Sequence, residues 1–189
     1  HSMKDTLEKF EDSDTLVGAD NHELGGISRS LPILIKEKVS KQEFMNLVRL
    51  THNGEVVEQT ADFIFNIMTE ILNGKNYKEA IEDNKNINQF IKNNFNKIGP
   101  KDKIVENADQ RGQGCSIEQG LPIVLDVLWN ADNLLEALTF NIMAGGDTSA
   151  RAMVIAAFMA ADEGLDSIPE KLIDGFNKSK SVNELLLKI

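Results

Sequence analysis

The sequence predicts an all-α fold, a bundle of several helices around one core. Apolar residues recur at helical spacing along most of the chain, and no stretch alternates apolar and polar residues convincingly. Hydrophobic residues make up 41% of the 189 residues, which is normal for a globular protein. Residues 150–161 are small or apolar almost all round. We expect this segment to be a helix without a solvent face that runs through the middle of the bundle.

Two regions are expected along the chain. Residues 1–24 are polar and acidic and form a leading segment with at most one short helix, and its first three residues resemble a remnant of cloning rather than a signal. Residues 25–189 are expected to form a single helical domain. Pro32 lies early in this domain, where the first turn of a helix tolerates proline.

Capping signals define the helices that follow. Ser40 and Glu43 form an S-x-x-E capping box, and we expect the helix that they open to end at Asn53-Gly54. The next helix is expected to end at Asn73-Gly74.

The second half of the chain continues this alternation of helices and turns. A thin amphipathic helix is expected between Ile87 and Phe95, and Gly99-Pro100 should end it. Further helices are expected to open at Asn76, at a second capping box of Ser116 and Gln119, and at Asn133.

A glycine turn precedes the least polar helix. Gly145 and Gly146 permit backbone geometry and close approach that side chains forbid, and Asp147 or Thr148 can cap the helix. The helix macrodipole disfavours a cation in the first turn, so Arg151 should face a carboxylate or a bound anion. Asp147 is the natural partner or, alternatively, a metal ligand. In the simplest alternative, Asp147 only caps the helix and Arg151 only pairs with it. The room that two glycines leave favours an anion pocket.

Composition excludes several classes of function. The net charge of −10 argues against nucleic acid as a partner, because phosphate binding relies on clustered Lys and Arg. The single cysteine, Cys115, excludes an internal disulfide, and we expect it to be a small buried residue. No apolar run reaches membrane-spanning length, so a cytoplasmic protein is the default expectation. Nucleotide-binding glycine motifs, His/Cys metal spacings and the G-x-S-x-G elbow are absent.

Several segments resemble a known family. GGDTSARA from Gly145, the small-residue helix after it, Gly164 and SIPEKL from Ser167 are similar to the C-terminal motif of ADP-ribosylglycohydrolases, usually GGDTDT. GGISRSLPILI from Gly25, the Leu-Thr-His ending at His52 and GCSIEQ from Gly114 resemble upstream segments in the same order. The resemblance implies an all-helical domain, a multi-helix orthogonal bundle, that hydrolyses N- or O-glycosidic ADP-ribose linkages. Magnesium would organise the ribose hydroxyls there while a water attacks the anomeric carbon.

The resemblance also implies which residues form the site. Arg29 and His52 match family positions near the ligand, although a surface arginine and a histidine that satisfies a helix end are simpler interpretations. Asp147 matches a magnesium ligand. The candidate ligand-binding residues are Gly145, Gly146, Thr148, Ser149, Arg151, Arg29 and His52, for ADP-ribose or an ADP-ribosylated substrate.

The chain departs from the catalytic pattern. Ser149 and Ala150 stand where the family motif has its second Asp and a Thr, so only Asp147 remains of three metal ligands. The motif is closer to the branch that resembles crystallin J1, which includes a lens protein. No GDALG-type or TDD-type segment is found, so the chain looks like the C-terminal half of such a protein. Two functions are therefore expected. One is a hydrolase with an incomplete magnesium site, and the other is a non-catalytic structural or ADP-ribose-binding module. The expected partner is a missing N-terminal half or a second copy.

Overall fold

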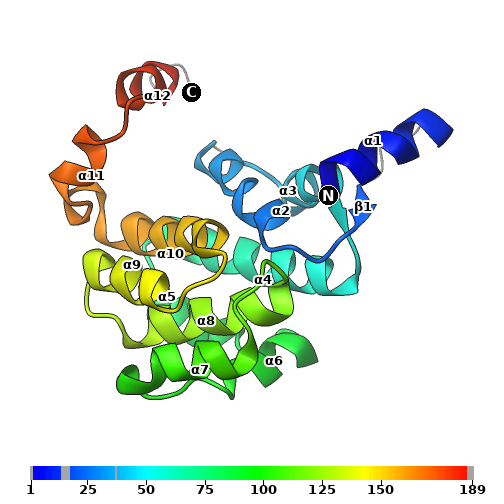
Figure 1. Ribbon diagram of the computed structural model, residues 1–189. Coiled ribbons are helices and arrows are strands. Elements are labelled where there is room, and N and C mark those ends of the chain that lie inside the picture. The colour runs from blue at the N-terminus through cyan, green and yellow to red at the C-terminus, as the bar shows by residue number, and fades with distance from the viewer. Residues whose placement is uncertain (1, 14–17, 37, 187–189) are drawn as a thin grey trace.

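The computed structural model describes residues 2–13, 18–36 and 38–186 (Figure 1). Helices cover 71% of the chain and pack as a bundle, which confirms the all-α prediction. The described elements are α1 (Ser2–Ser13), β1 (Ala19–Asp20), α2 (Gly25–Ser28), η1 (Leu31–Ile35), α3 (Lys41–Arg49), β2 (His52–Asn53), α4 (Glu55–Leu72), α5 (Tyr77–Asn84), α6 (Gln89–Phe95), η2 (Lys101–Lys103), α7 (Ile104–Arg111), α8 (Ile117–Asn130), α9 (Leu134–Met143), α10 (Thr148–Glu163), η3 (Leu165–Ser167), α11 (Glu170–Asp174) and α12 (Ser179–Leu186).

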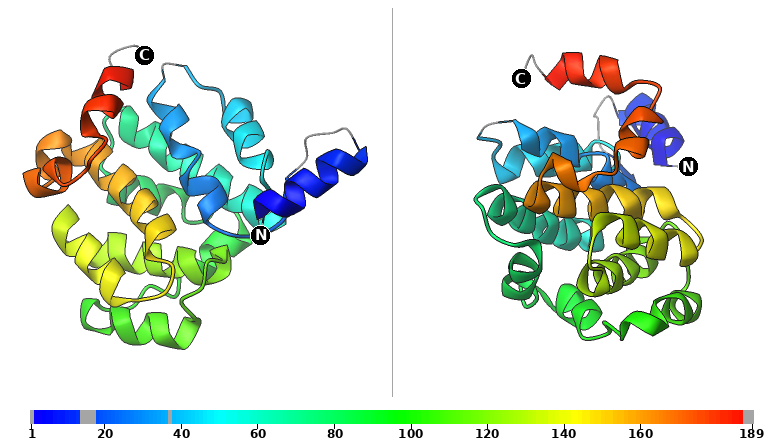
Figure 2. Two further views of the ribbon diagram at one scale, coloured as in Figure 1. Left: turned by 45° about the horizontal axis from the view of Figure 1, so that its top comes forward. Right: turned by 90° about the vertical axis from the view of Figure 1, so that its left-hand side faces the viewer.

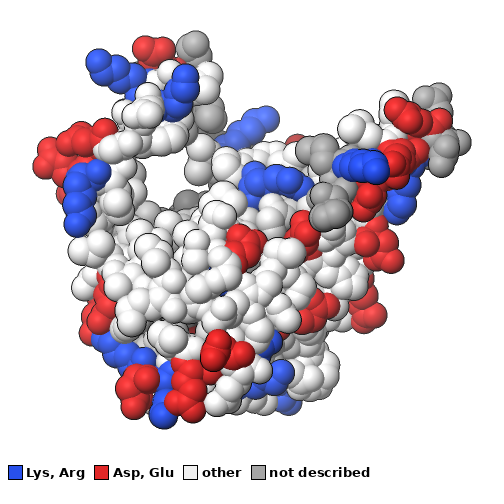
Figure 3. All heavy atoms as spheres, in the orientation of Figure 1, with Lys and Arg blue, Asp and Glu red and all other residues white. Residues whose placement is uncertain are grey.

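Helix α10 lies at the centre of the packing but keeps one face at the surface. It contacts α9, α8, α4 and α2, and Val154, Ile155 and Phe158 are buried in the core. Met153 is 42% exposed, however, and Ala156 is only partly buried. The expectation of a helix without a solvent face is therefore wrong. Small apolar residues suit an open face as well as a buried one, and the surface over α10 carries few charges (Figure 3).

Most of the capping contacts predicted at the helix starts are formed. The Ser40–Glu43 capping box is formed, and the side chains of Asn76 and Asn133 accept backbone N–H groups of α5 and α9. Ser116 stands at the N-cap of α8 but makes no side-chain capping bond. The second predicted box is therefore wrong, because the side chain of Gln119 accepts the N–H of Gly114 at 2.7 Å instead.

Helix α3 ends at Arg49, earlier than its predicted end at Asn53-Gly54. His52 and Asn53 form β2, which pairs in parallel with β1, and Gly54 precedes α4. The amide of Asn53 donates to the carbonyl of Gly18 at 3.0 Å and helps to hold the pairing. His52 therefore lies on a strand rather than at a helix end. Two-residue strands leave no alternating pattern in a sequence.

The last two helices stand apart from the bundle. Helices α11 and α12 project beyond α10 in all three views (Figures 1 and 2). Leu172, Ile173 and Phe176 in this segment are exposed. None of the helices in the described ranges is both long and apolar enough to span a membrane.

Candidate functional site

The side chain of His52 is at the centre of a polar cluster. It projects from β2 and is only 1% exposed. Gly26 of α2 lies against the ring, because a Cβ atom built at Gly26 would lie 2.4 Å from His52 Cγ. A glycine at this position is thus required for the imidazole to be buried.

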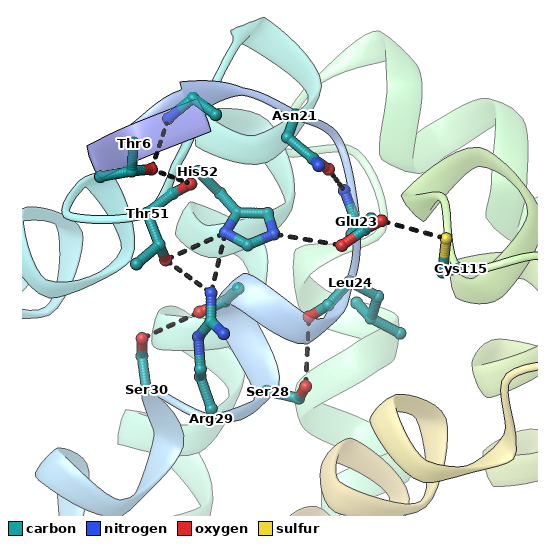
Figure 4. Close-up of polar contacts among 12 residues, drawn as sticks. Thr6, Asn21, Glu23, Leu24, Ser28, Arg29, Ser30, Thr51, His52 and Cys115 are labelled. Carbon is teal, nitrogen blue, oxygen red and sulfur yellow. Dashed lines mark hydrogen bonds and ion pairs between the residues drawn. The ribbon is translucent and has the colours of Figure 1, made fainter. Parts of the chain in front are cut away.

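Arg29 fixes the tautomer of this histidine. Its Nη2 atom donates to Thr51 Oγ1 at 2.7 Å and lies 3.0 Å from His52 Nδ1 (Figure 4). A guanidinium can only donate, so Nδ1 must accept and the proton of the neutral ring is on Nε2. Burial lowers the pKa of His52, and the nearby Arg29 cation lowers it further, while Glu23 acts in the opposite direction. The ring is therefore neutral near pH 7.

Glu23 faces the protonated nitrogen of His52. Its Oε2 atom lies 3.7 Å from Nε2, and its Oε1 atom accepts the thiol proton of Cys115 at 3.3 Å (Figure 4). The backbone around Glu23 is held by antiparallel pairing, in which the Leu24 N–H donates to the Cys115 carbonyl at 3.0 Å. Glu23 is a site residue that the sequence reasoning missed, because one Glu in an acidic leading segment carries no distinguishing pattern.

Cys115 is exposed, so the expectation of a small buried residue is wrong. It lies just before α8, in the loop that pairs with the segment around Glu23. Partial burial raises the pKa of the Cys115 thiol, and the carboxylates of Glu23 and Asp147 raise it further. The thiol therefore stays protonated at neutral pH and acts as a hydrogen-bond donor rather than a nucleophile.

A second group of predicted residues surrounds the start of α10. Asp147 is at the N-cap but makes no side-chain capping bond, and Ser149 Oγ donates to its carboxylate at 3.3 Å. Gly146 has a φ of +67°, and a Cβ atom there would lie 1.8 Å from the Gln113 carbonyl oxygen. The space beside Gly146 is therefore filled by the chain at Gln113. The glycine leaves room for this loop rather than for a ligand.

Arg151 braces the turn between α9 and α10. It is 1% exposed, its Nε atom donates to Asn141 Oδ1 at 2.8 Å, and its Nη2 atom donates to the Gly145 carbonyl. No carboxylate of the described residues pairs with it, and Asp147 acts on it only through longer-range attraction. The salt bridge with Asp147, considered as the simplest interpretation, is therefore absent. Its Nη1 atom is buried without a hydrogen-bond partner among these residues.

The predicted residues thus fall into two neighbouring groups. Arg29 and His52 belong to one cluster with Glu23. Gly145 to Arg151 form the turn into α10, where the Thr148 carbonyl accepts the amide of Asn141 at 2.8 Å. The loop before α8 touches both groups, through Cys115 on one side and through the Gln113 carbonyl, which accepts the Asp147 N–H at 3.0 Å, on the other.

A surface hollow elsewhere is a weaker candidate. It has a volume of about 530 Å³ and lies beside α3 and α4. Its charged side chains already neutralise one another, since Lys41 pairs with Asp62 and Arg49 pairs with Glu58. This hollow has no unpaired charge to offer a ligand, in contrast to the cluster around His52.

The sequence model of the ADP-ribosylglycohydrolase family matches residues 1–189. The chain belongs to the ADP-ribosylglycohydrolase family. The match includes the first 24 residues, beyond the part in which individual motifs are recognisable. A comparison with curated proteins found no match.

A magnesium site does not fit the residues of this family member. In the described ranges, no three His, Cys, Asp or Glu side chains come together as a set that could hold a metal ion. Asp147 brings one carboxylate, and that carboxylate is engaged by its own neighbour Ser149. Magnesium demands near-ideal octahedral coordination by oxygen, so one carboxylate at a helix start is a poor site.

Proposed function

We propose that this ADP-ribosylglycohydrolase family member binds ADP-ribose, or an ADP-ribosylated substrate, beside the Arg29–His52–Glu23 cluster. The observation that carries the proposal is the convergence of a cation, a neutral imidazole and a carboxylate from separate segments. Arg29 is exposed, and one guanidinium nitrogen is used on Thr51 and His52. The remaining N–H groups can bind the oxygens of a diphosphate.

Catalysis by this chain alone is not part of the proposal. The resemblance implies paired magnesium ions in the active family, and Ser149 and Ala150 remove two of the three ligands of the motif. Asp147 then contributes a single carboxylate. We therefore propose that hydrolysis at a family-like rate requires metal ligands from outside the chain.

The partner that could supply those ligands is an N-terminal half of the same domain or a second copy of the chain. Ile142, Met143 and Met153, on α9 and α10, are large apolar residues that are exposed. Such side chains are often covered at an interface. This exposure supports a partner of either kind, and we propose that the assembled domain acts in the cytoplasm.

The alternative is a non-catalytic structural module similar to crystallin J1. The lost motif residues favour it, and so do the internal roles of Gly146 and Arg151 in the turn. It requires no ligand. The two proposals therefore differ in whether ADP-ribose stabilises the protein.

Thermal unfolding with millimolar ADP-ribose tests the binding proposal. The unmutated chain should gain thermal stability, Arg29→Gln should lose most of that gain, and Arg49→Gln should keep it, because the guanidinium of Arg49 is already paired with Glu58. No gain for the unmutated chain would leave only the structural module. Magnesium-dependent release of ADP-ribose from a modified substrate that disappears in Asp147→Ala would contradict the proposed lack of catalysis.

A further inference from the structure

His52 Nε2 is a buried hydrogen-bond donor without a partner in the described part of the chain. The nearest acceptor is Glu23 Oε2 at 3.7 Å, which is too far for a hydrogen bond. Burying an unsatisfied donor is unfavourable, and such a group in a folded protein calls for an explanation. A group that binds both side chains at once would satisfy the donor.

The chemistry of the two groups restricts what can lie between them. The neutral imidazole offers only an N–H at this position, because Arg29 occupies the other ring nitrogen, and the carboxylate offers only acceptors. A hydroxyl both accepts and donates, so it can accept from Nε2 and donate to Oε2. An oxygen about 2.8 Å from each atom spans the gap. A phosphate oxygen has no proton for Glu23, and an ammonium group cannot accept from Nε2.

The contacts of Glu23 leave one of its carboxylate oxygens to accept from such a hydroxyl. Cys115 holds Oε1 from the opposite side, so Oε2 is the oxygen directed to His52 (Figure 4). Glu23 Oε2 lies 3.7 Å from Nε2, and the Glu23 side chain is 34% exposed, so this carboxylate is accessible from outside the cluster. The site therefore places a buried donor beside an accessible acceptor.

We infer that Glu23 and His52 form a hydroxyl-binding pair that recognises a sugar hydroxyl of the ligand, next to the anion-binding group Arg29. The inference rests on the proposed binding of ADP-ribose and names the groups that distinguish its ribose from a plain diphosphate. Arg29 has a positioning role in addition, because its contact with Nδ1 keeps the proton on Nε2.

Binding of two probes to Glu23→Gln tests the pair. ADP-ribose carries sugar hydroxyls, whereas inorganic pyrophosphate carries no sugar. The variant should bind ADP-ribose about tenfold more weakly, as expected for a lost hydrogen bond to a charged group, and should bind pyrophosphate at least as well as the unmutated chain does. Glu118→Gln is the matched control, because Glu118 also contacts a histidine, His22 at 3.3 Å, and lies outside the cluster.

The outcomes separate this inference from the proposed function. If the unmutated chain binds neither probe, the proposed function fails. If it binds ADP-ribose and Glu23→Gln binds it equally well, only the hydroxyl-binding pair is overturned. Should Glu23→Gln fold poorly, Glu23→Asp keeps the charge, shortens the reach and should show the same selective loss of ADP-ribose.

Nuclear magnetic resonance of the imidazole provides a second readout. In the unmutated chain, the ring proton of His52 should be on Nε2, and ADP-ribose should shift the Nε2 signal while pyrophosphate leaves it nearly unchanged. A proton on Nδ1, or equal shifts from both probes, would overturn the inference. This measurement does not depend on catalytic activity.

Discussion

The turn into α10 and the cluster around His52 differ in how open their polar groups are to a ligand. At the turn, Arg151 donates to Asn141 and Gly145, and the chain at Gln113 fills the space beside Gly146. Each region keeps one buried donor without a partner among the described residues, Arg151 Nη1 at the turn and His52 Nε2 in the cluster, but the cluster also has an exposed cation, Arg29. The turn carries the motif that is easiest to recognise in the sequence, yet most of its contacts stabilise the fold. The groups open to a ligand lie in the less distinctive region.

Arg151 at the turn and Arg29 in the cluster differ in the same way as the two regions. Arg151 is almost completely buried and bonds to neutral oxygen atoms, whereas Arg29 is exposed and contacts Thr51 and His52. Burying a cation without a carboxylate is unfavourable, so its contacts to the turn must offset that cost. We therefore expect Arg151 to act on stability and Arg29 to act on ligand binding.

Replacing each arginine with alanine should give the largest difference between the regions. Arg151→Ala should lower the free energy of unfolding by about 3–5 kcal/mol, because it removes a large buried side chain and leaves two buried oxygens without a donor. Arg29→Ala should lower it by about 1 kcal/mol, since its contacts are partly exposed. Urea unfolding of both variants measures the difference.

Ligand-induced stabilisation should show the reverse order. ADP-ribose should still stabilise Arg151→Ala and should fail to stabilise Arg29→Ala. If Arg151→Ala also lost the gain, the free Nη1 atom of Arg151 would be part of an anion site. The turn would then be a ligand site as well as a structural brace.

The pH dependence of stability should report on His52. Its pKa in the folded chain lies below the ordinary value of 6.5, so the unfolded chain takes up the proton first as the pH falls. The free energy of unfolding should thus decrease below pH 6.5 by up to about 1.4 kcal/mol per pH unit, until the pKa of folded His52 is reached.

The difference between the unmutated chain and His52→Gln isolates this contribution. The variant should lack the decrease between pH 6.5 and the lowered pKa. In Arg29→Gln, the pH range over which the free energy of unfolding decreases should be narrower, because the cation of Arg29 helps to lower the pKa of His52. Urea unfolding at several pH values checks both. If the free energy of unfolding of His52→Gln decreases with falling pH as steeply as that of the unmutated chain, other groups cause the decrease.

Sequence patterns predicted the helices better than they predicted the site. Helical spacing and the caps at Ser40, Asn76 and Asn133 depend on neighbouring residues, which a sequence displays. The pairing of β1 with β2 and the contact of Glu23 with Cys115 join segments that are far apart. Such contacts are set by tertiary packing and leave no local pattern.

The same distinction explains the errors around α10. The local sequence correctly indicated a turn that needs glycine, but the reason for Gly146 is the passing chain at Gln113. It also indicated that Arg151 needs partners, but these are an amide and a carbonyl rather than an anion. A sequence shows that a constraint exists more readily than it shows which atoms impose it.

The smallest expected effect compares two helix starts. Asn133 Oδ1 accepts the Glu136 N–H at 2.9 Å, so Asn133→Ala should lower the free energy of unfolding by about 1 kcal/mol. Asp147 makes no such bond, and its carboxylate acts only through the helix dipole and the distant charge of Arg151. Asp147→Ala should therefore cost about 0.5 kcal/mol, and salt should reduce that cost but leave the cost of Asn133→Ala unchanged. Urea unfolding at low and high salt measures both. Equal losses that are insensitive to salt would show that Asp147 caps α10 after all, and that the one aspartate of the motif retained in this chain stabilises the turn.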